Sequence, residues 1–472
     1  MNSTSLLLAG LALTTTAAYG KTIPNYAAAD LVLGQANFTS NLTPSLPTAA
    51  SYDGPGAVIV DPVTRKLFVA DIDNHRVLRY ASVDSLTNGA AAEAVFGQSD
   101  FTTKVAASGY AGMNLPVGLC LDQVGRLWVA DLGNNRVLMF DAGAVRSSGA
   151  AADRVYGQIN FTTGAAGLAA NRMNFPSDLF VDSTDRLWVA DSLNHRVLRF
   201  DNISNKLSGA NADGVLGQTN FTVNSITTGA SGLNYPRGVT VSAGGELFVS
   251  STSQNRVLRF NDAATLGNGA AATAVLGQPD FSTMTSGVSA TQMYVPYGST
   301  LTADDSLWVC DGFNRRVLRF DNASTKVSGA AADGVVGQPD FTTSSAGLTD
   351  RKIAAAFIKP FVDAKGALWV PDNTNDRVLR FSPDVTPPLL AVTAPAKVTK
   401  KKVITLKGTA SDAYGISKVE YRIGKGPLRL ATGTTAWSFK AKLKKGKNTI
   451  TVTATDVDGI QSLRKIIKIT RR

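Results

Sequence analysis

A repeat of about 60 residues governs this chain of 472 residues. Six segments of the form Arg-Val-Leu-x-aromatic recur at intervals of 60 residues, with 61 before the last, and they open at Arg76, Arg136, Arg196, Arg256, Arg316 and Arg377. A Gly-Gln pair also recurs six times, and its second residues are Gln35, Gln98, Gln158, Gln218, Gln278 and Gln338. Such a period indicates a repeat architecture, in which each repeat is one small unit packed on its neighbours.

Each repeat contains four short apolar segments separated by Gly, Asn and Asp. In the second repeat these segments are 116–122, 127–130, 136–140 and 155–158. Short β-branched and aromatic runs between turn residues predict strands, and no segment of helical period competes with them. Six repeats of four strands predict an all-β fold, a six-bladed β-propeller. The chain begins with an isolated fourth strand at 32–35, which we expect to complete the last blade and close the ring.

Two segments resemble a known repeat family. The sequences Trp-Val-Ala-Asp-Leu-Gly-Asn-Asn-Arg-Val at 128–137 and Val-Ala-Asp-Ser-Leu-Asn-His-Arg-Val at 189–197 resemble NHL repeats. The resemblance extends over residues 30–382 and implies an NHL-type propeller there. It leaves the function open, because NHL propellers serve as protein binders, RNA binders, sensors and a few lyases.

Other segments lie on either side of the propeller. Residues 1–20 carry no charge and end in Ala-Tyr-Gly after a short apolar stretch, which predicts a signal peptide and a secreted or cell-envelope protein. No apolar run reaches the roughly 20 residues of a transmembrane helix. Residues 383–388 are a Pro-rich linker. Alternating residues in 389–472 predict a small β-sandwich. The segments 408–412, 447–450 and 454–456 resemble the bacterial Ig-like domains found at the ends of exported proteins, which implies an Ig-like fold here.

The charge is concentrated in this last domain. Residues 386–472 contain 19 Lys/Arg and 4 Asp/Glu, a net charge of +15, whereas residues 1–385 have a net charge of −4. Three lysines alternate with apolar residues and form a candidate site for acidic cell-envelope polymers: Lys440, Lys442 and Lys444. The alternative is protection of a sheet edge against aggregation. Nucleic acid is not an expected partner, because few aromatic residues accompany the basic ones.

Composition restricts the chemistry further. The chain has two His and three Glu against 33 Asp, which excludes a three-His zinc site and leaves little for acid–base catalysis. We therefore predict no catalytic residues and no metal ligands. The two cysteines, Cys120 and Cys310, fall in the second and fifth blades, too far apart for a disulfide.

Five repeats carry Asp-x-x-Asn-x-Arg between the second and third strands, and the fourth has Ser251, Gln254 and Arg256 instead. A ring of carboxylates could bind a ligand, but a residue that recurs in nearly every blade is better explained by a blade-stabilising turn. His75 and His195 lie inside this motif and are interpreted as turn residues in the same way.

The channel mouth is the candidate ligand site. The first strand of each blade lines the channel of such a propeller, so the residues after its opening Pro should surround the mouth: Gly56-Ala57, Val117-Gly118, Ser177-Asp178, Arg237-Gly238, Tyr297-Gly298 and Ile358-Lys359. Four side chains break the pattern of small residues and are the predicted ligand-binding residues: Asp178, Arg237, Tyr297 and Lys359. The alternative is chance variation on an exposed rim.

These features favour an exported, non-enzymatic binding or scaffold protein. The propeller would bind a protein or polysaccharide ligand, and the basic module would act as a spacer or envelope attachment. The alternative is a metal-dependent propeller lyase or lactone hydrolase, with calcium as its cofactor, held in the channel by Asp side chains and carbonyls.

Overall fold

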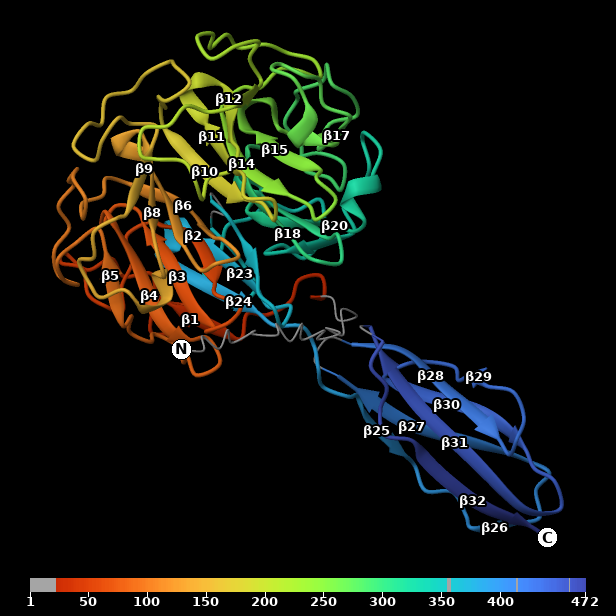
Figure 1. Cartoon of the computed structure of the whole chain (residues 1–472). Helices are drawn as coiled ribbons and strands as arrows, with labels where there is room; N and C mark the ends of the chain where they lie inside the picture. Colours follow the sequence, from red (N-terminus) through yellow and green to blue (C-terminus); the bar gives the residue numbers. More distant parts are fainter. Residues whose placement is uncertain (1–22, 355–357, 413–414, 458) are drawn as a thin grey trace, which may run out of the picture.

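The computed structural model describes residues 23–354, 358–412, 415–457 and 459–472. The predicted signal peptide, 1–20, lies outside this part of the chain. Six four-stranded antiparallel sheets form a ring, and a β-sandwich follows it at the C-terminal end (Figure 1). The prediction of an all-β fold with a six-bladed propeller and an Ig-like domain is confirmed. Among the described residues, no helix has the length and hydrophobicity needed to cross a membrane.

Five blades take all four strands from consecutive segments of the chain, and the sixth combines three such strands with β1. Blade one contains β2 (Pro55–Val60), β3 (Lys66–Asp71), β4 (Arg76–Ser82) and β5 (Ala94–Phe96), and blade two contains β6 (Pro116–Leu121), β7 (Leu127–Asp131), β8 (Arg136–Phe140) and β9 (Arg154–Tyr156). Blade three contains β10 (Pro176–Val181), β11 (Leu187–Asp191), β12 (Arg196–Phe200) and β13 (Gly214–Leu216), and blade four contains β14 (Pro236–Val241), β15 (Leu247–Ser251), β16 (Arg256–Phe260) and β17 (Ala274–Leu276). Blade five contains β18 (Pro296–Leu301), β19 (Leu307–Asp311), β20 (Arg316–Phe320) and β21 (Gly334–Val336), and blade six contains β22 (Phe361–Val362), β23 (Leu368–Asp372), β24 (Arg377–Phe381) and β1 (Leu31–Leu33).

The first strand of the chain completes the last blade. β1 pairs antiparallel with β24, with Leu31 opposite Arg380 and Leu33 opposite Val378. The ring is thereby closed by main-chain hydrogen bonds, and β24 is not left as an open sheet edge.

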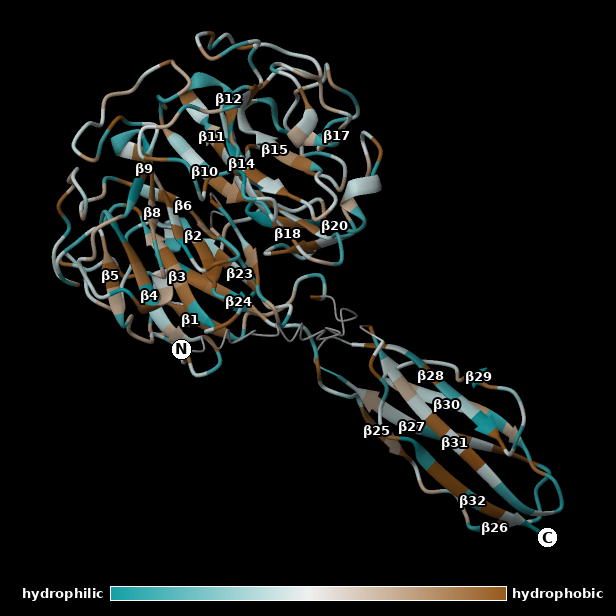
Figure 2. Cartoon of the chain, viewed as in Figure 1, coloured by the Kyte–Doolittle hydropathy of each residue, from teal (hydrophilic) through white to brown (hydrophobic). Residues whose placement is uncertain are grey.

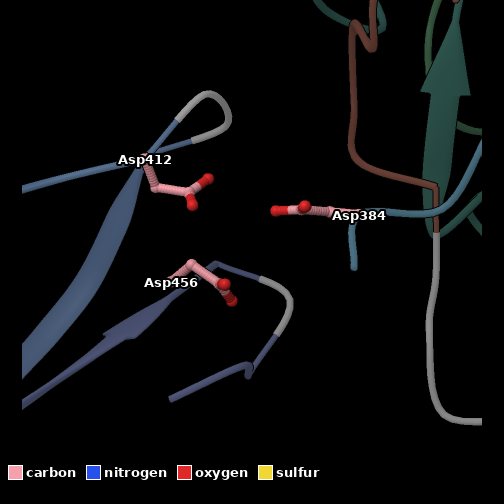
Figure 3. Close-up of side chains that lie close together, drawn as sticks. All are labelled: Asp384, Asp412 and Asp456. Carbon is pink, nitrogen blue, oxygen red and sulfur yellow. The ribbon is translucent and has the colours of Figure 1, made fainter. Parts of the chain in front are cut away.

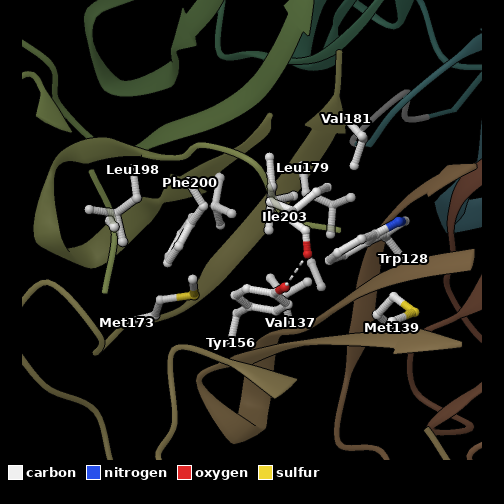
Figure 4. Close-up of a cluster of buried hydrophobic side chains, with 14 of the residues drawn as sticks. Trp128, Val137, Met139, Tyr156, Met173, Leu179, Val181, Leu198, Phe200 and Ile203 are labelled. Atoms are coloured by element: carbon white, nitrogen blue, oxygen red, sulfur yellow. Dashed lines mark hydrogen bonds between the residues drawn. The ribbon is translucent and has the colours of Figure 1, made fainter. Parts of the chain in front are cut away.

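The hydrophobic cores lie between neighbouring blades. Trp128 and Tyr156 of blade two face Leu179 and Phe200 of blade three, and the Tyr156 hydroxyl donates a hydrogen bond to the Ile203 carbonyl at 3.3 Å (Figure 4). Hydrophobic residues are concentrated on the strands, while the loops are more hydrophilic (Figure 2). Each blade therefore buries its apolar face only when its neighbour is present, as repeat architectures require.

The Asp-x-x-Asn-x-Arg motif forms a buried turn in five blades. In blade two, Arg136 Nε donates to Asp131 Oδ2 at 2.6 Å, and Asn134 Nδ2 donates to the same oxygen at 2.8 Å. The Asp and Arg side chains are fully buried in all five. Burial raises the pKa of each carboxyl against the lowering by its Arg. Since burial offsets part of the gain from pairing, these ion pairs act mainly by fixing the turn geometry.

Short 3-10 helices lie in these turns and after the third strands. They are η1 (Leu132–Asn134), η2 (Gly143–Val145), η3 (Ser192–Asn194), η4 (Thr252–Gln254), η5 (Ala263–Thr265), η6 (Gly312–Asn314), η7 (Ala323–Thr325) and η8 (Asn373–Asn375).

The same Arg and the repeated Gln order the long loops. Arg136 donates to the carbonyls of Gly109 and Gly112, at 3.0 and 2.9 Å, in the loop that precedes its blade. Gln158 Nε2 donates at 2.9 Å to the carbonyls of Asn135 and Ala165. Equivalent Gln bonds occur in all six repeats, so both markers of the repeat hold loops in place.

Blade four contains a different turn. Ser251 Oγ donates to Gln254 Oε1 at 2.7 Å, and a terminal nitrogen of Arg256 donates to the same oxygen at 2.8 Å. Arg256 Nε is buried and has no hydrogen-bond partner among the described residues. With no carboxylate beside it, burial lowers the pKa of Arg256 to about 10.

The C-terminal domain is a two-sheet sandwich. One sheet has the order β25 (Leu389–Val392), β27 (Val403–Ser411), β30 (Ala436–Lys442); the other has the order β26 (Val398–Thr399), β32 (Lys465–Arg471), β31 (Gly446–Asp456), β28 (Ile416–Ile423), β29 (Arg429–Leu430). Trp437, Phe439 and Tyr421 pack at its centre, the last two stacked at 3.6 Å between ring centroids.

The structure agrees with the prediction that the two cysteines are too far apart for a disulfide. Cys120 and Cys310 are buried and form no disulfide. Burial raises the pKa of Cys120 to about 11 and raises that of Cys310 as well, so neither thiol is activated.

Candidate functional site

A cavity of about 190 Å³ lies at the channel mouth. Five of the six blades contribute to it the residue directly after the Pro position: Val117, Ser177, Arg237, Tyr297 and Ile358. Turn residues from the first three blades also line it: Ile72, Asp73, Leu132 and Ser192. The lining is mostly apolar, with a few polar groups, as is typical of a ligand pocket.

Arg237 is held between two aromatic rings in this cavity. Its guanidinium carbon lies 4.3 Å from the centroid of the Tyr235 ring and 4.9 Å from that of Tyr297. Among the described residues it makes no salt bridge, and its buried Nε has no hydrogen-bond partner. The two rings restrict the guanidinium to one orientation and leave its charge uncompensated by a carboxylate.

The blade-one side of the cavity is acidic. Asp73 lines the cavity, and the carboxylates of Asp53 and Asp376 lie close to it. Burial raises the pKa of Asp73, and repulsion from Asp53 and Asp376 adds to the rise. Blades one and four lie opposite each other in the ring of six blades. The mouth therefore has an anionic side at Asp73 and a cationic side at Arg237.

The residues before the Pro also reach the cavity. Leu115, Phe175 and Tyr235 line it, and their φ angles are 53°, 57° and 56°. Bulky side chains rarely adopt this left-handed region, so the surrounding structure must hold them there.

Bonds from the preceding blade hold these residues. His195 Nδ1 accepts the Tyr235 N–H at 3.1 Å, and His75 Nδ1 accepts the Leu115 N–H at 3.1 Å. Asn135 Oδ1 accepts the Phe175 N–H at 2.9 Å in the equivalent position. The two His therefore act as neutral acceptors in turns, and through Tyr235 one of them positions Arg237.

Asp178 and Lys359 are not among the described residues that line this cavity. Lys359 Nζ lies 3.0 Å from Asp178 Oδ1, and the two residues are 4% and 1% exposed. Burial raises the pKa of Asp178 against the lowering by Lys359. Their predicted ligand contact remains a prediction, and in the structure each is the other's partner.

The lysines of the C-terminal domain lie on an edge strand. Lys440 and Lys442 are exposed on β30, the last strand of its sheet, and Lys444 is exposed just beyond it. Ala441 and Leu443, between them, are buried. A row of lysines on one side of an edge strand fits both a polyanion site and protection of the edge.

Sequence reasoning missed the residues before the Pro and the turn residues. The signal for the first group was present, since positions 115, 175, 235 and 295 hold Leu, Phe, Tyr and Val at 60-residue intervals. A periodic bulky residue beside a turn predicts a shared inward position, but its backbone conformation depends on the neighbouring blade.

Family comparisons agree with this architecture. Residues 113–140 and 173–200 match the NHL repeat, and residues 388–452 match the bacterial Ig domain. The chain therefore contains NHL repeats in two blades of its propeller and a bacterial Ig domain near its C-terminal end. Bacterial Ig domains are typical of extracellular and surface proteins, and NHL propellers generally mediate protein interactions. The comparison with curated proteins gives no match.

Several solved structures are similar to the propeller of this chain. One is selenomethionine-substituted virginiamycin B lyase from Staphylococcus aureus, 14% identical, with a TM-score of 0.40 over 71% of this chain and 97% of that chain. Another is hydrazine synthase from Kuenenia stuttgartiensis, 12% identical, with a TM-score of 0.43 over 74% and 99%. A third is the calcium-binding protein regucalcin from Agrobacterium tumefaciens, 14% identical, with a TM-score of 0.40 over 77% and 95%.

Proposed function

We propose that this protein is an exported, non-enzymatic binding protein whose propeller mouth takes the carboxylate-bearing end of a protein ligand. The basic Ig domain would space the propeller from the envelope or attach it there. Arg237 carries the proposal, because its guanidinium is fixed between Tyr235 and Tyr297 and pairs with no carboxylate of the described chain. A preorganised, partly buried Arg binds a carboxylate strongly, since little side-chain freedom is lost on binding.

The size and lining of the cavity define the ligand. A volume of about 190 Å³ suits one side chain or a chain end. Apolar side chains such as Leu115, Leu132 and Ile358 surround Arg237, so the anionic group of the ligand should adjoin an apolar group. A peptide that ends in an apolar residue supplies both groups, whereas a neutral glycan would leave Arg237 unpaired.

The enzyme alternative finds less support in the cavity. Asp73 is the only carboxylate among its described lining residues, and none of them is a His. Calcium in the channel, with lyase or lactone hydrolase activity, therefore remains the second proposal. A channel metal whose removal abolishes turnover and leaves the fold intact would support it over the binding role.

Peptide binding to the full chain tests the first proposal. Tetrapeptides that end in Leu or Phe, with free or amidated C-termini, would be compared by isothermal titration calorimetry. We expect binding only with the free carboxylate, and a loss of at least about tenfold in Arg237→Ala, since charge-assisted hydrogen bonds contribute about 1.5–3 kcal/mol. Arg464→Ala, which removes an exposed Arg of the Ig domain, is the matched control.

Two results would contradict this proposal. Equal binding of free and amidated peptides would remove the carboxylate from the recognition. Binding of acidic oligosaccharides such as oligogalacturonate, without peptide binding, would make the ligand a glycan.

The attachment role of the Ig domain has its own test. Polygalacturonate binding by the full chain would be measured at low and moderate salt, and the triple change of Lys440, Lys442 and Lys444 to Gln should weaken it at low salt. Unchanged polymer binding, with increased aggregation of the variant, would instead assign these lysines to protection of the β30 edge.

A further inference from the structure

Three aspartates meet where the propeller joins the Ig domain. Asp384 follows β24 in the linker, Asp412 follows β27, and Asp456 is the last residue of β31 (Figure 3). One carboxylate oxygen from each lies within 4.8 Å of the others. Asp384 and Asp456 are 4% and 1% exposed, so two of the three carboxylates are shielded from water. Their mutual repulsion is costly unless a positive charge compensates it.

The Asp384 carboxylate has one hydrogen-bonded oxygen and one oxygen without a hydrogen bond from the described residues. Its Oδ1 accepts hydrogen bonds from the Thr386 N–H at 2.9 Å and the Thr386 hydroxyl at 2.6 Å. Its Oδ2 is buried and accepts no hydrogen bond from the described residues. Figure 3 shows the side chain extended from the linker toward Asp412 and Asp456. A buried carboxylate oxygen without a donor calls for a partner such as a water molecule or a cation.

We propose that Asp384, Asp412 and Asp456 bind one Ca²⁺ ion. The three side chains offer only oxygen ligands, the donors that hard cations prefer, and no His or Cys belongs to the cluster. Ca²⁺ takes six to eight oxygens in flexible geometry, so backbone carbonyls and water would complete its shell. Mg²⁺ requires a stricter octahedron and should bind more weakly.

The ion would fix the orientation of the two domains. Asp384 belongs to the linker, and the other two residues belong to strand ends of the Ig domain, so one ion ties the linker to that end of the sandwich. Pro387 and Pro388 follow Asp384 by three and four residues and stiffen the connection. This site lies outside the propeller cavity, and the inference does not depend on the proposed peptide ligand.

Calcium titration of the EDTA-treated full chain tests the inference. We expect one Ca²⁺ per chain with a Kd of about 1 mM or tighter, the range of extracellular calcium modules. Asp384→Asn keeps the turn acceptor but removes the charge, and it should weaken binding at least tenfold. Asp340→Asn is the matched control, because Asp340 accepts the same two bonds from Thr342 in an exposed Asp-x-Thr turn.

Small-angle X-ray scattering gives a second readout. Calcium should narrow the distribution of maximum dimensions in the wild-type chain and leave Asp384→Asn unchanged. Asp456→Asn, checked for a folded Ig domain by its thermal transition, should behave like Asp384→Asn. The inference is overturned if no saturable binding occurs at millimolar Ca²⁺, or if Asp384→Asn binds as the wild type does.

Discussion

Protonation of His195 should make the stability of the propeller depend on pH. Its Nδ1 accepts the Tyr235 N–H at 3.1 Å, so protonation of Nδ1 removes the acceptor and leaves that N–H unpaired. Burial lowers the pKa of His195 below its ordinary value of about 6.5. The folded state therefore binds this proton less readily than the unfolded state. The stability that His195 contributes is present above about pH 6.5 and is lost as the pH falls toward the lowered pKa.

The size of the effect follows from one hydrogen bond and from proton linkage. A donor left unpaired costs roughly 1–3 kcal/mol, and the lower end applies because the imidazole is only partly buried. Linkage sets a ceiling of about 2 kcal/mol at pH 5, since each pH unit below the unfolded pKa contributes at most about 1.4 kcal/mol. We expect a loss of about 1 kcal/mol between pH 7.5 and pH 5.

Asn at the same position should remove this loss. Asn255 Oδ1 already accepts the Val295 N–H at 2.8 Å in blade four, and Asn does not titrate in this range. Guanidinium unfolding of wild type and His195→Asn, followed by Trp fluorescence from pH 5 to 7.5, should give curves that diverge by about 1 kcal/mol at the acid end. The reciprocal change Asn255→His should add a similar acid sensitivity. If the free energies of unfolding of wild type and His195→Asn differ by the same amount at every pH, the role assigned to protonation of His195 is refuted.

Two further predictions concern buried charges. Ser251→Asp with Gln254→Asn rebuilds in blade four the turn of the other blades and gives Arg256 Nε a partner, so stability in guanidinium should rise by about 1–3 kcal/mol; no gain would contradict this. Lys359→Met leaves Asp178 buried without its cation and should cost about 3–5 kcal/mol, and adding Asp178→Asn should recover most of the loss in the same assay. A double variant as unstable as Lys359→Met would show that the ion pair is not the cause.

Most of the fold could be predicted because each of the six repeats carries the same local pattern of strand and turn residues. Strands are predicted from alternation within short segments, and turns from the Gly, Asn or Asp between them, so both depend only on residues close in the sequence. One repeat is therefore enough to predict the four strands of a blade, and the other five repeats support the same assignment. Ring closure was predictable for the same reason, because the isolated segment before the first repeat had one place to pair.

The site was only partly predictable because its geometry depends on distant contacts. Position after the Pro was enough to select Arg237 and Tyr297, which line the cavity. It did not reveal that Lys359 pairs with Asp178, 181 residues away in the sequence. Nor did it reveal the left-handed backbone at Tyr235, which depends on a bond from His195 in the preceding blade.

Closure of the ring by β1 also affects the order of events during synthesis. Asp30 and Arg380, which pair beside the closing strand, are 350 residues apart in the sequence. Loop closure over such a separation is slow, and β1 has no partner until β24 has been made. A growing chain therefore carries an unpaired strand at its start while five blades can already stack. Until β24 is complete the final blade cannot form, and nascent chains would be most exposed to edge-to-edge aggregation in that interval.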